Sequence, residues 1–280
     1  MKAKRIAALA LTTIGTASMM AMAADASTPA AAKAGSFSPD HPVTLKVLAD
    51  VVPHAELLNF VKPKLAAIGV NLEVTISDFS RDGNEAVDNG EYDANYFEHV
   101  PYLDSVKKEK GYDLASAGGI HVEPIGFYSS KWKSLKELPA KATFEIPNDV
   151  TNEYRALRIL EAAGFIKLKA GIKVGEATLK DVDKYLKPVK IVELDAGQLI
   201  RDLPDFDGGV INTNRVLEAG IDASSAFFRE GKDSPYANII VTKTARVNDP
   251  AIQALVKALR TEEVRKFIQA KYKGAVIPAF

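Results

Sequence analysis

The sequence predicts an α/β protein, and two observations support this prediction. Short apolar runs alternate with amphipathic helical patterns along most of the 280 residues, which is the order expected of strand–helix units with mostly parallel pairing. Hydrophobic residues make up 47% of the chain, enough for a sizeable core and against disorder. At roughly 100–200 residues per domain, the folded part should form one large domain or two smaller ones.

The first half of the folded part should begin near Val43. Leu58, Val61 and Leu65 recur at helical spacing, and a glycine follows as a stop signal. Pro63 lies inside this pattern and is expected to kink or shorten the helix. The predicted strands are 44–49, 71–76 and 92–97, and the predicted helices are 54–68 and 84–89.

The second half repeats the alternation. Leu157 and Leu160 mark the inner face of a helix over 152–163, which Gly164 ends. Residues 120–129 should be extended. Further strands are predicted at 143–146, 190–194, 208–211 and 237–241, and further helices at 197–203, 250–259 and 261–272.

The N-terminus has the three parts of a secretory signal peptide. Basic residues at positions 2, 4 and 5 precede an uncharged run to Met20, and the small residues of Ala21-Met22-Ala23 supply a cleavage site. We therefore expect residues 1–23 to be a signal peptide and residues 24–42 a flexible spacer. No later segment approaches the ~20 apolar residues of a membrane span, so the mature chain should be soluble.

Charge and composition exclude several classes of protein. Lys plus Arg (36) equal Asp plus Glu (36), so neither a nucleic-acid partner nor a polybasic membrane patch is expected. The chain has no cysteine, which excludes thiol catalysis and cysteine-based metal sites. It contains no G-x-S-x-G, P-loop, H-E-x-x-H or G-x-G-x-x-G motif. The sequence thus indicates neither an enzyme nor a cofactor.

The histidines leave a metal site as an alternative. His54, His99 and His121, with glutamates nearby, could form a three-histidine zinc site of a metal-binding receptor. None of them forms an i, i+4 or H-x-H pair. The competing interpretation, which we favour, is that each histidine makes local hydrogen bonds or lines an apolar pocket.

Polar side chains follow several predicted strands, where ligands bind in α/β sheets. Arg155 could hold a carboxylate through two parallel hydrogen bonds, and the asparagines of these loops could serve a carboxylate and an ammonium. Phe79, Phe97 and a histidine ring would enclose an apolar side chain. This mixture suits a free amino acid. The alternatives are a surface role for Arg155, core packing for Phe97 and turn formation for the asparagines.

Taken together, these segments resemble one family, the methionine-binding lipoproteins of the NlpA/MetQ type, which are the extracytoplasmic receptors of methionine ABC importers. The similarity runs from about Thr44 to the last residue, and the joint order of its motifs is specific although each motif alone is weak. The matching segments are Pro53-His54-Ala55-Glu56, 90–104, His121-Val122-Glu123-Pro124, 146–149, 151–157, 190–194, Val210-Ile211-Asn212, 233–238 and 273–280.

The resemblance implies a two-lobed periplasmic-binding-protein fold, type II-like, with a hinge and a ligand cleft between the lobes. Lobe I would comprise residues 43–127 plus 235–280, and lobe II residues 128–234. The implied ligand is methionine or a close amino-acid relative. The implied partner is an inner-membrane ABC permease with its ATPase, to which this protein would deliver the ligand as a monomer. Arg155 would bind the carboxylate. The other implied site residues are Asn152, Asn212 and Asn238 as polar contacts, Phe79, Phe97, His99 and His121 as the side-chain pocket, and Asn148 at the adjacent turn.

The chain departs from this family pattern in several places. Glu98 stands where glutamine is usual, and Val150 and Tyr154 replace a proline and a glycine. Residues 80–84 carry what looks like a one-residue insertion, and residues 50–52 differ from the usual small residues. At the signal cleavage site the family's acylated cysteine is replaced by alanines. We therefore expect a receptor that is cleaved and released into the periplasm.

Overall fold

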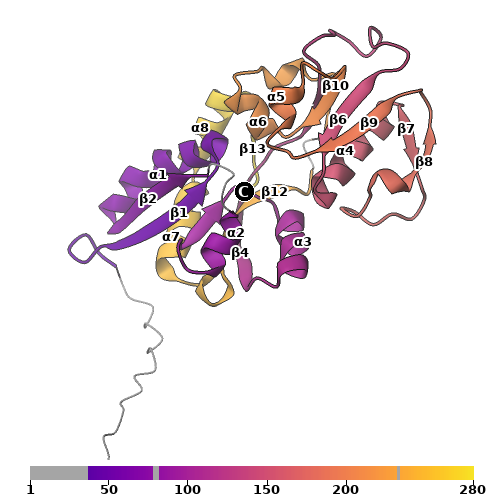
Figure 1. Ribbon diagram of the computed structural model, residues 1–280. Coiled ribbons are helices and arrows are strands. Elements are labelled where there is room, and N and C mark those ends of the chain that lie inside the picture. Colours follow the sequence, from indigo (N-terminus) through magenta and orange to yellow (C-terminus); the bar gives the residue numbers. More distant parts are fainter. Residues whose placement is uncertain (1–36, 78–81, 232–233) are drawn as a thin grey trace, which may run out of the picture. The chain divides into compact units, whose positions relative to one another are not determined.

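The computed structural model describes residues 37–77, 82–231 and 234–280. The predicted signal peptide, most of the spacer and Phe79 lie outside them. The described part contains a six-stranded sheet, a five-stranded sheet and a two-stranded hairpin (Figure 1). The strands are β1 (Val43–Ala49), β2 (Val70–Ile76), β3 (Ala94–Tyr96), β4 (Leu114–Val122), β5 (Gly126–Tyr128), β6 (Thr143–Pro147), β7 (Ile166–Leu168), β8 (Val182–Tyr185), β9 (Lys190–Leu194), β10 (Gly208–Ile211), β11 (Phe228–Arg229), β12 (Ala237–Lys243) and β13 (Ile277–Pro278).

The helices alternate with these strands, which confirms the predicted α/β class. They are α1 (Glu56–Ala67), α2 (Gly83–Asp88), α3 (Val100–Lys110), α4 (Val150–Ala162), α5 (Leu199–Asp202), α6 (Thr213–Glu218), α7 (Pro250–Leu259) and α8 (Glu262–Tyr272), with short helical turns η1 (Val51–Ala55), η2 (Leu179–Asp181), η3 (Ala223–Ser225) and η4 (Thr244–Arg246).

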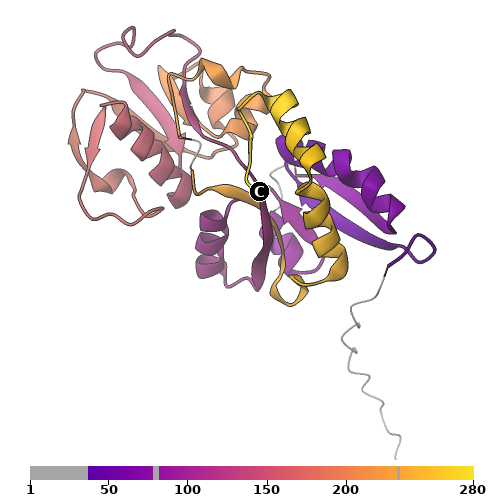
Figure 2. The same ribbon diagram turned by 180° about the vertical axis from the view of Figure 1, so that it is seen from behind.

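The first sheet has the strand order β13-β4-β12-β3-β1-β2 and is covered on both faces. Leu45 and Val47 of β1 point into a large core built with α1, α7 and α8. Figure 2 shows α7 and α8, in yellow, running beside this sheet. On the other face, Val87 of α2 and Leu103 of α3 pack with Ile239 of β12 in a smaller core.

The second sheet has the order β11-β5-β10-β6-β9. One face carries α4 and the β7–β8 hairpin, where Phe144 packs edge to face on Phe127 and Phe165, with ring centroids 4.9 Å apart in each pair. The other face meets α5 and α6, whose buried residues Leu199 and Val216 join the core of the first sheet. The two sheets therefore share packed apolar contacts on one side.

Strand pairing is mixed, which corrects the expectation of mostly parallel pairing. β1 is parallel to β2 and β3, and β6 is parallel to β9 and β10. However, β12 is antiparallel to β3 and β4, and β5 is antiparallel to β10 and β11. The physical reason is that the chain leaves the first sheet at the end of β4 and returns to it through β12, so these neighbours run in opposite directions.

The chain passes between the sheets twice. The first passage, Glu123–Ile125, lies between β4 and β5, and the second lies between Arg229 of β11 and Ala237 of β12. Phe127, which the sequence placed at the end of lobe I, pairs with Val210 in the second sheet. The extended segment predicted over 120–129 is thus divided between two sheets.

Two helices differ from the sequence expectation. Helix α1 continues through Pro63, because the missing N–H leaves only the carbonyl of Asn59 unpaired and Asn59 is exposed to water. Helix α3 was not predicted. Leu103 is its one buried residue, so apolar periodicity is weak there, although Pro101 near its start and Gly111 at its left-handed end were available as signals.

In the described part of the chain, no helix combines the length and apolarity that crossing a membrane requires.

Candidate functional site

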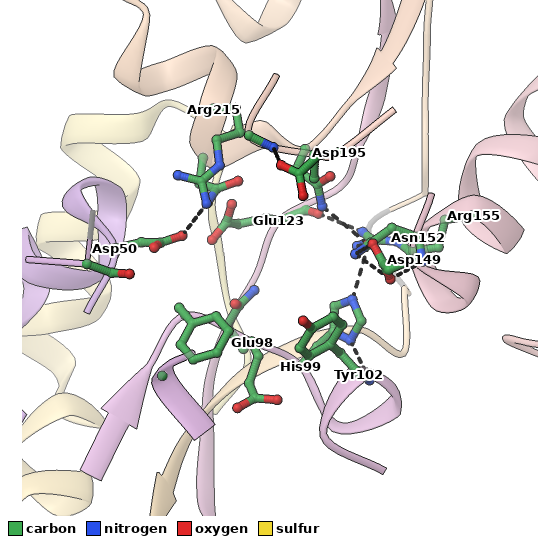
Figure 3. Close-up of a pocket in the computed structure, with 18 of the residues that line it drawn as sticks. Asp50, Glu98, His99, Tyr102, Glu123, Asp149, Asn152, Arg155, Asp195 and Arg215 are labelled. Carbon is green, nitrogen blue, oxygen red and sulfur yellow. Dashed lines mark hydrogen bonds and ion pairs between the residues drawn. The ribbon is translucent and has the colours of Figure 1, made fainter. Parts of the chain in front are cut away.

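A cavity of about 460 Å³ lies where the loops of the two sheets meet (Figure 3). Its size falls within the range of about 300–1,000 Å³ typical of small-molecule sites. The lining comes from the ends of β1, β3 and β10, the starts of α2, α4 and β12, and the first passage between the sheets. The lining residues are Asp50, Ser77, Asp82, Gly83, Phe97, Glu98, His99, Tyr102, Glu123, Asn148, Asp149, Asn152, Arg155, Asp195, Ala196, Gly197, Asn212, Asn214, Arg215 and Asn238.

The structure brings together most of the predicted site residues. Seven of them line the cavity: Phe97, His99, Asn148, Asn152, Arg155, Asn212 and Asn238. His121 is completely buried and is absent from that lining. It lies behind the wall of the site, so its expected place in the side-chain pocket is not what the structure shows.

The carboxamide of Asn152 is the point where the site converges. Its Oδ1 accepts from His99 Nε2 at 3.3 Å, from Arg155 Nη1 at 3.1 Å and from Asn212 Nδ2 at 3.2 Å. Its Nδ2 donates to both oxygens of Asp149, the residue that caps α4. Asp149 and the Asn152 side chain thus fix each other's orientation. Side chains from the end of β10 and from the starts of α3 and α4 meet at Asn152 Oδ1.

Arg155 is buried and already strongly engaged. Its Nε and Nη2 donate two parallel hydrogen bonds to the carboxylate of Glu230, and Nη2 also donates to the backbone oxygen of Glu123 at 2.9 Å. The guanidinium lies over the ring of Tyr236, 4.3 Å from the centroid. The two-bond geometry expected for a ligand carboxylate is therefore formed with Glu230, which leaves Nη1 as the edge that faces Asn152.

His99 enters the site as a neutral ring. Its Nδ1 accepts from the backbone N–H of Tyr102, capping α3, so its Nε2 carries the proton donated to Asn152. Burial, assisted by the positive charge of Arg155, lowers the pKa of His99 to about 3. The ring therefore stays uncharged at neutral pH and acts as a hydrogen-bond donor across the cavity.

A chain of buried groups supports Glu123 on the wall of the cavity. The Tyr96 hydroxyl donates to His121 Nδ1 at 2.5 Å, and His121 Nε2 donates to Glu123 Oε1 at 2.7 Å. Burial lowers the pKa of His121 to about 3, so the ring is neutral. Burial also raises the pKa of Glu123, although the charge of Arg155 opposes this shift.

The histidine set proposed for zinc does not assemble. Within the described residues, the one group of three side chains that could hold a metal is His54, His121 and Glu123, with ligand atoms within 4.8 Å of one another. His99 instead bonds to Asn152 and packs against Tyr236. His54 Nε2 lies 3.0 Å from Asn238 Oδ1, a contact that joins the η1 turn to the start of β12.

An ion pair closes the opposite end of the cavity. Asp50, which follows β1, accepts from Arg215 Nη2 at 2.8 Å and from Asn214 Nδ2 at 2.9 Å. Both donors belong to α6, after the second sheet. Figure 3 shows this pair on the side of the site away from Asn152 and Asp149.

The remaining wall is aromatic. Phe97 is half-buried and meets Tyr102 edge to face, with ring centroids 6.3 Å apart. It also lies directly on Gly83, since a Cβ built there would approach Phe97 Cε1 to 2.6 Å. This close approach requires glycine at the start of α2 and gives the cavity one apolar side.

Several important residues escaped the sequence analysis. Glu230 and Asp50 belong to no motif with a known spacing, and no local signal pointed to them. Glu123 was named in a segment that resembles the family and counted among the glutamates near the histidines, but no ligand contact was assigned to it. Tyr236 stood in a segment noted before a strand, where its aromatic ring was the available signal.

Comparisons with known proteins identify relatives of this chain. The family model described as NlpA lipoprotein matches residues 45–280. The methionine-binding lipoprotein MetQ of Bacillus subtilis is 35% identical over 237 residues, covering 83% of this chain and 86% of that protein. The membrane lipoprotein TpN32 of Treponema pallidum is 38% identical over 244 residues, covering 86% of this chain and 89% of that protein.

Solved structures share the fold. A nutrient binding protein from Burkholderia cenocepacia, bound to methionine, superposes with a TM-score of 0.81 at 42% identity, covering 84% of this chain and all of that one. An ABC transporter periplasmic substrate-binding protein from Coxiella burnetii gives 0.79 at 37% identity, covering 84% and 100%. The two-lobed substrate-binding-protein fold expected from the sequence is thereby confirmed, and the chain belongs to the NlpA lipoprotein family.

Proposed function

We propose that this protein is an extracytoplasmic solute-binding protein that binds methionine, or a close amino-acid relative, and delivers it to an ABC permease with its ATPase. Its relatives support this assignment, since one is named methionine-binding and one structural neighbour is bound to methionine. Such relatives are substrate-binding proteins, so the cavity is expected to hold its ligand without converting it.

The observation that carries the proposal is the convergence at Asn152. Arg155 Nη1 and Asn212 both contact its Oδ1, so a cationic donor and the Asn212 amide lie side by side. Asn212 Oδ1 is buried and lacks a hydrogen-bond partner. An unpaired buried acceptor costs about 1–3 kcal/mol, and an ammonium group would satisfy it.

A free amino acid matches both sides of this arrangement. Its carboxylate would take the second N–H of Arg155 Nη1, whose first N–H donates to Asn152, and its ammonium would bind Asn212 Oδ1 and the carboxylate of Glu123. Asn148 and Asn238 would complete the polar contacts from opposite walls. Every charge of the ligand then meets a partner, as burial of a zwitterion requires.

The aromatic wall would hold the ligand's side chain. Phe97, with Tyr102 beside it, presents ring surface to the cavity, and a thioether packs favourably on aromatic edges. We keep Phe79 and His121 in the proposed site, His121 as the residue that orients Glu123 rather than as a direct contact.

Closure around the ligand would involve the two passages between the sheets. We propose residues 43–122 plus 237–280 as lobe I and residues 126–229 as lobe II, which moves the boundaries expected at 127 and 235 to the strand ends and leaves the two passages as the hinge. His99 and Asn152 come from different lobes and bond directly, so a closed lobe arrangement explains their contact.

We further propose that the mature protein is a freely diffusing periplasmic monomer. The sequence has no cysteine that could be acylated, whereas the relatives are named lipoproteins. Cell fractionation tests this: the mature protein should be released with the periplasmic fraction, and an acylated, membrane-bound form would contradict it.

Calorimetric titration with methionine tests the binding function. The wild type should bind, and Arg155→Ala should lose binding because the carboxylate loses its cationic donor. Arg158→Ala is the matched control, since Arg158 lies one turn along α4 and pairs at the surface with Glu161. Unchanged affinity in Arg155→Ala would overturn the carboxylate assignment, and stoichiometric zinc in the purified protein would favour the metal-binding alternative.

A further inference from the structure

Four buried polar atoms lie together beneath the aromatic wall without a hydrogen-bond partner. They are both carboxyl oxygens of Glu98, the Nδ2 of Asn84 and the Oδ1 of Asn95. Glu98 is 4% exposed, and both asparagines are completely buried. Such atoms are rare in native proteins and require an explanation.

The surrounding bonds fix how the asparagines are oriented. Asn95 Nδ2 donates to the backbone oxygen of Gly83 at 3.2 Å and to Asn84 Oδ1 at 2.9 Å. Asn95 therefore presents its oxygen, and Asn84 its NH₂ group, to their remaining neighbour. That neighbour is Glu98, whose pKa both amides lower.

The count of donors and acceptors decides the protonation state of Glu98. An ionised carboxylate has acceptors alone, so it would pair with Asn84 Nδ2 and face Asn95 Oδ1 with a second acceptor. A carboxylic acid has one O–H donor and one carbonyl acceptor. These match Asn95 Oδ1 and Asn84 Nδ2, so the acid would offer each amide a partner of the complementary kind.

The charges near Glu98 favour the same state. Burial raises its pKa to about 8 against the hydrogen bonds of the Asn84 and Asn95 amides, which lower it, and the negative charge of Asp82 adds to the upward shift. From α3, Tyr102 faces it with a neutral hydroxyl whose own pKa is raised. From β12, the backbone N–H of Ile239 donates to the backbone carbonyl oxygen of Glu98 at 2.9 Å, so this element brings no charge to the carboxyl group. His99, the next residue, is neutral.

This group supports the binding cavity from below. Figure 3 shows the Glu98 carboxyl directed away from Glu123 and Arg155, into the body of the first sheet. Asn84 lies in α2 and Asn95 in β3, and Gly83 and Phe97 beside them form the aromatic wall in close contact. A bridge from Glu98 to both asparagines would add to their direct hydrogen bond in holding Gly83 against Phe97.

We propose that Glu98 is a positioning residue of the ligand site that works as an uncharged carboxylic acid, its O–H donating to Asn95 and its carbonyl accepting from Asn84. Ionisation would set two acceptors against each other beside Asp82 and would loosen the Phe97 wall. Ligand affinity should therefore fall at alkaline pH. The ligand part of this inference rests on the proposed amino-acid function.

The test compares the wild type with Glu98→Gln, whose amide keeps one donor and one acceptor at every pH. Methionine affinity is measured by calorimetry from pH 6 to pH 9.5. Because the ligand's own amino group also titrates in this range, the quantity of interest is the ratio of the two affinities. The wild-type affinity divided by the Glu98→Gln affinity should be constant below pH 8 and should fall above it. The limit is about a tenfold decrease per pH unit for the loss of one proton.

Glu85→Gln is the matched control, because Glu85 is an exposed carboxylate on α2, next to Asn84 in the sequence. It should follow the wild-type pH profile. A Glu98→Gln profile identical to that of the wild type would overturn the proposal.

A readout without ligand separates this inference from the proposed function. The infrared difference spectrum between the wild type and Glu98→Gln at pH 7 should contain the band of one protonated carboxyl group, contributed by the wild type; carboxyl groups common to both proteins cancel. The presence of this band together with no methionine binding would contradict the proposed function alone. An unchanged spectrum in Glu98→Gln would contradict the role of Glu98, whatever the ligand.

Discussion

Arg155 and Glu230 face each other through two parallel hydrogen bonds, Nε to Oε1 at 2.9 Å and Nη2 to Oε2 at 2.5 Å. Glu230 also accepts from the backbone N–H of Ile125, so it ties both passages between the sheets to the arginine. The pair compensates the charge of a buried guanidinium and fixes its orientation. The sequence analysis had assigned the same two-bond geometry to the ligand.

Replacing Glu230 by glutamine should weaken methionine binding by about 10- to 100-fold. The variant loses one charge-assisted bond, each worth about 1.5–3 kcal/mol, and Arg155 is then free to turn from Asn152. Calorimetry measures the effect. Glu176→Gln, at an exposed surface pair with Lys173, should bind as the wild type does. Tighter binding by Glu230→Gln would show that Glu230 competes with the ligand.

The ion pair between Asp50 and Arg215 joins the end of β1 to α6. Asp50→Asn removes the charge but keeps the side-chain size, so we expect ligand to dissociate about tenfold faster with a smaller change in the association rate. Stopped-flow binding measures both rates. A double-mutant cycle with Arg215→Ala should give a coupling energy above about 0.5 kcal/mol, as contacting residues do. Additive effects would contradict a direct role for this pair.

Acid should destabilise the protein through its buried histidines. The pKa values of His99 and His121 lie near 3 in the folded protein, against 6.5 for an ordinary histidine. The unfolded chain therefore binds more protons between these values, and stability falls as the pH drops from about 6.5 to 3. The midpoint of thermal unfolding should decrease across this range.

His121→Gln provides the comparison for this pH dependence. It should reduce the slope of the unfolding midpoint against pH, because one buried titrating ring is removed. His41→Gln, at an exposed position, should leave the slope unchanged. Equal slopes in all three proteins would show that the buried ring is not responsible.

The sequence located much of the site through local chemistry. The Pro-Asn-Asp turn followed by a helix placed Asn152 and Arg155 at the start of α4, because a capping aspartate and a strand end are recognisable in sequence. His99 was identified for its position after a strand, and it caps α3 as well. Asn212 and Asn238 lie at strand ends and reach the cavity as predicted.

The sequence by itself determined the α/β class, most strands and helices, and the family, since periodicity, caps and motif order are properties of neighbouring residues. The tertiary structure alone decided which distant groups meet. Glu230 is 75 residues from Arg155, and Asp50 is 165 residues from Arg215. His121 faces Tyr96 rather than the cavity for the same reason. Side-chain partners and protonation states depend on burial and on contacts made after the sheets assemble, and local sequence patterns carry no record of either.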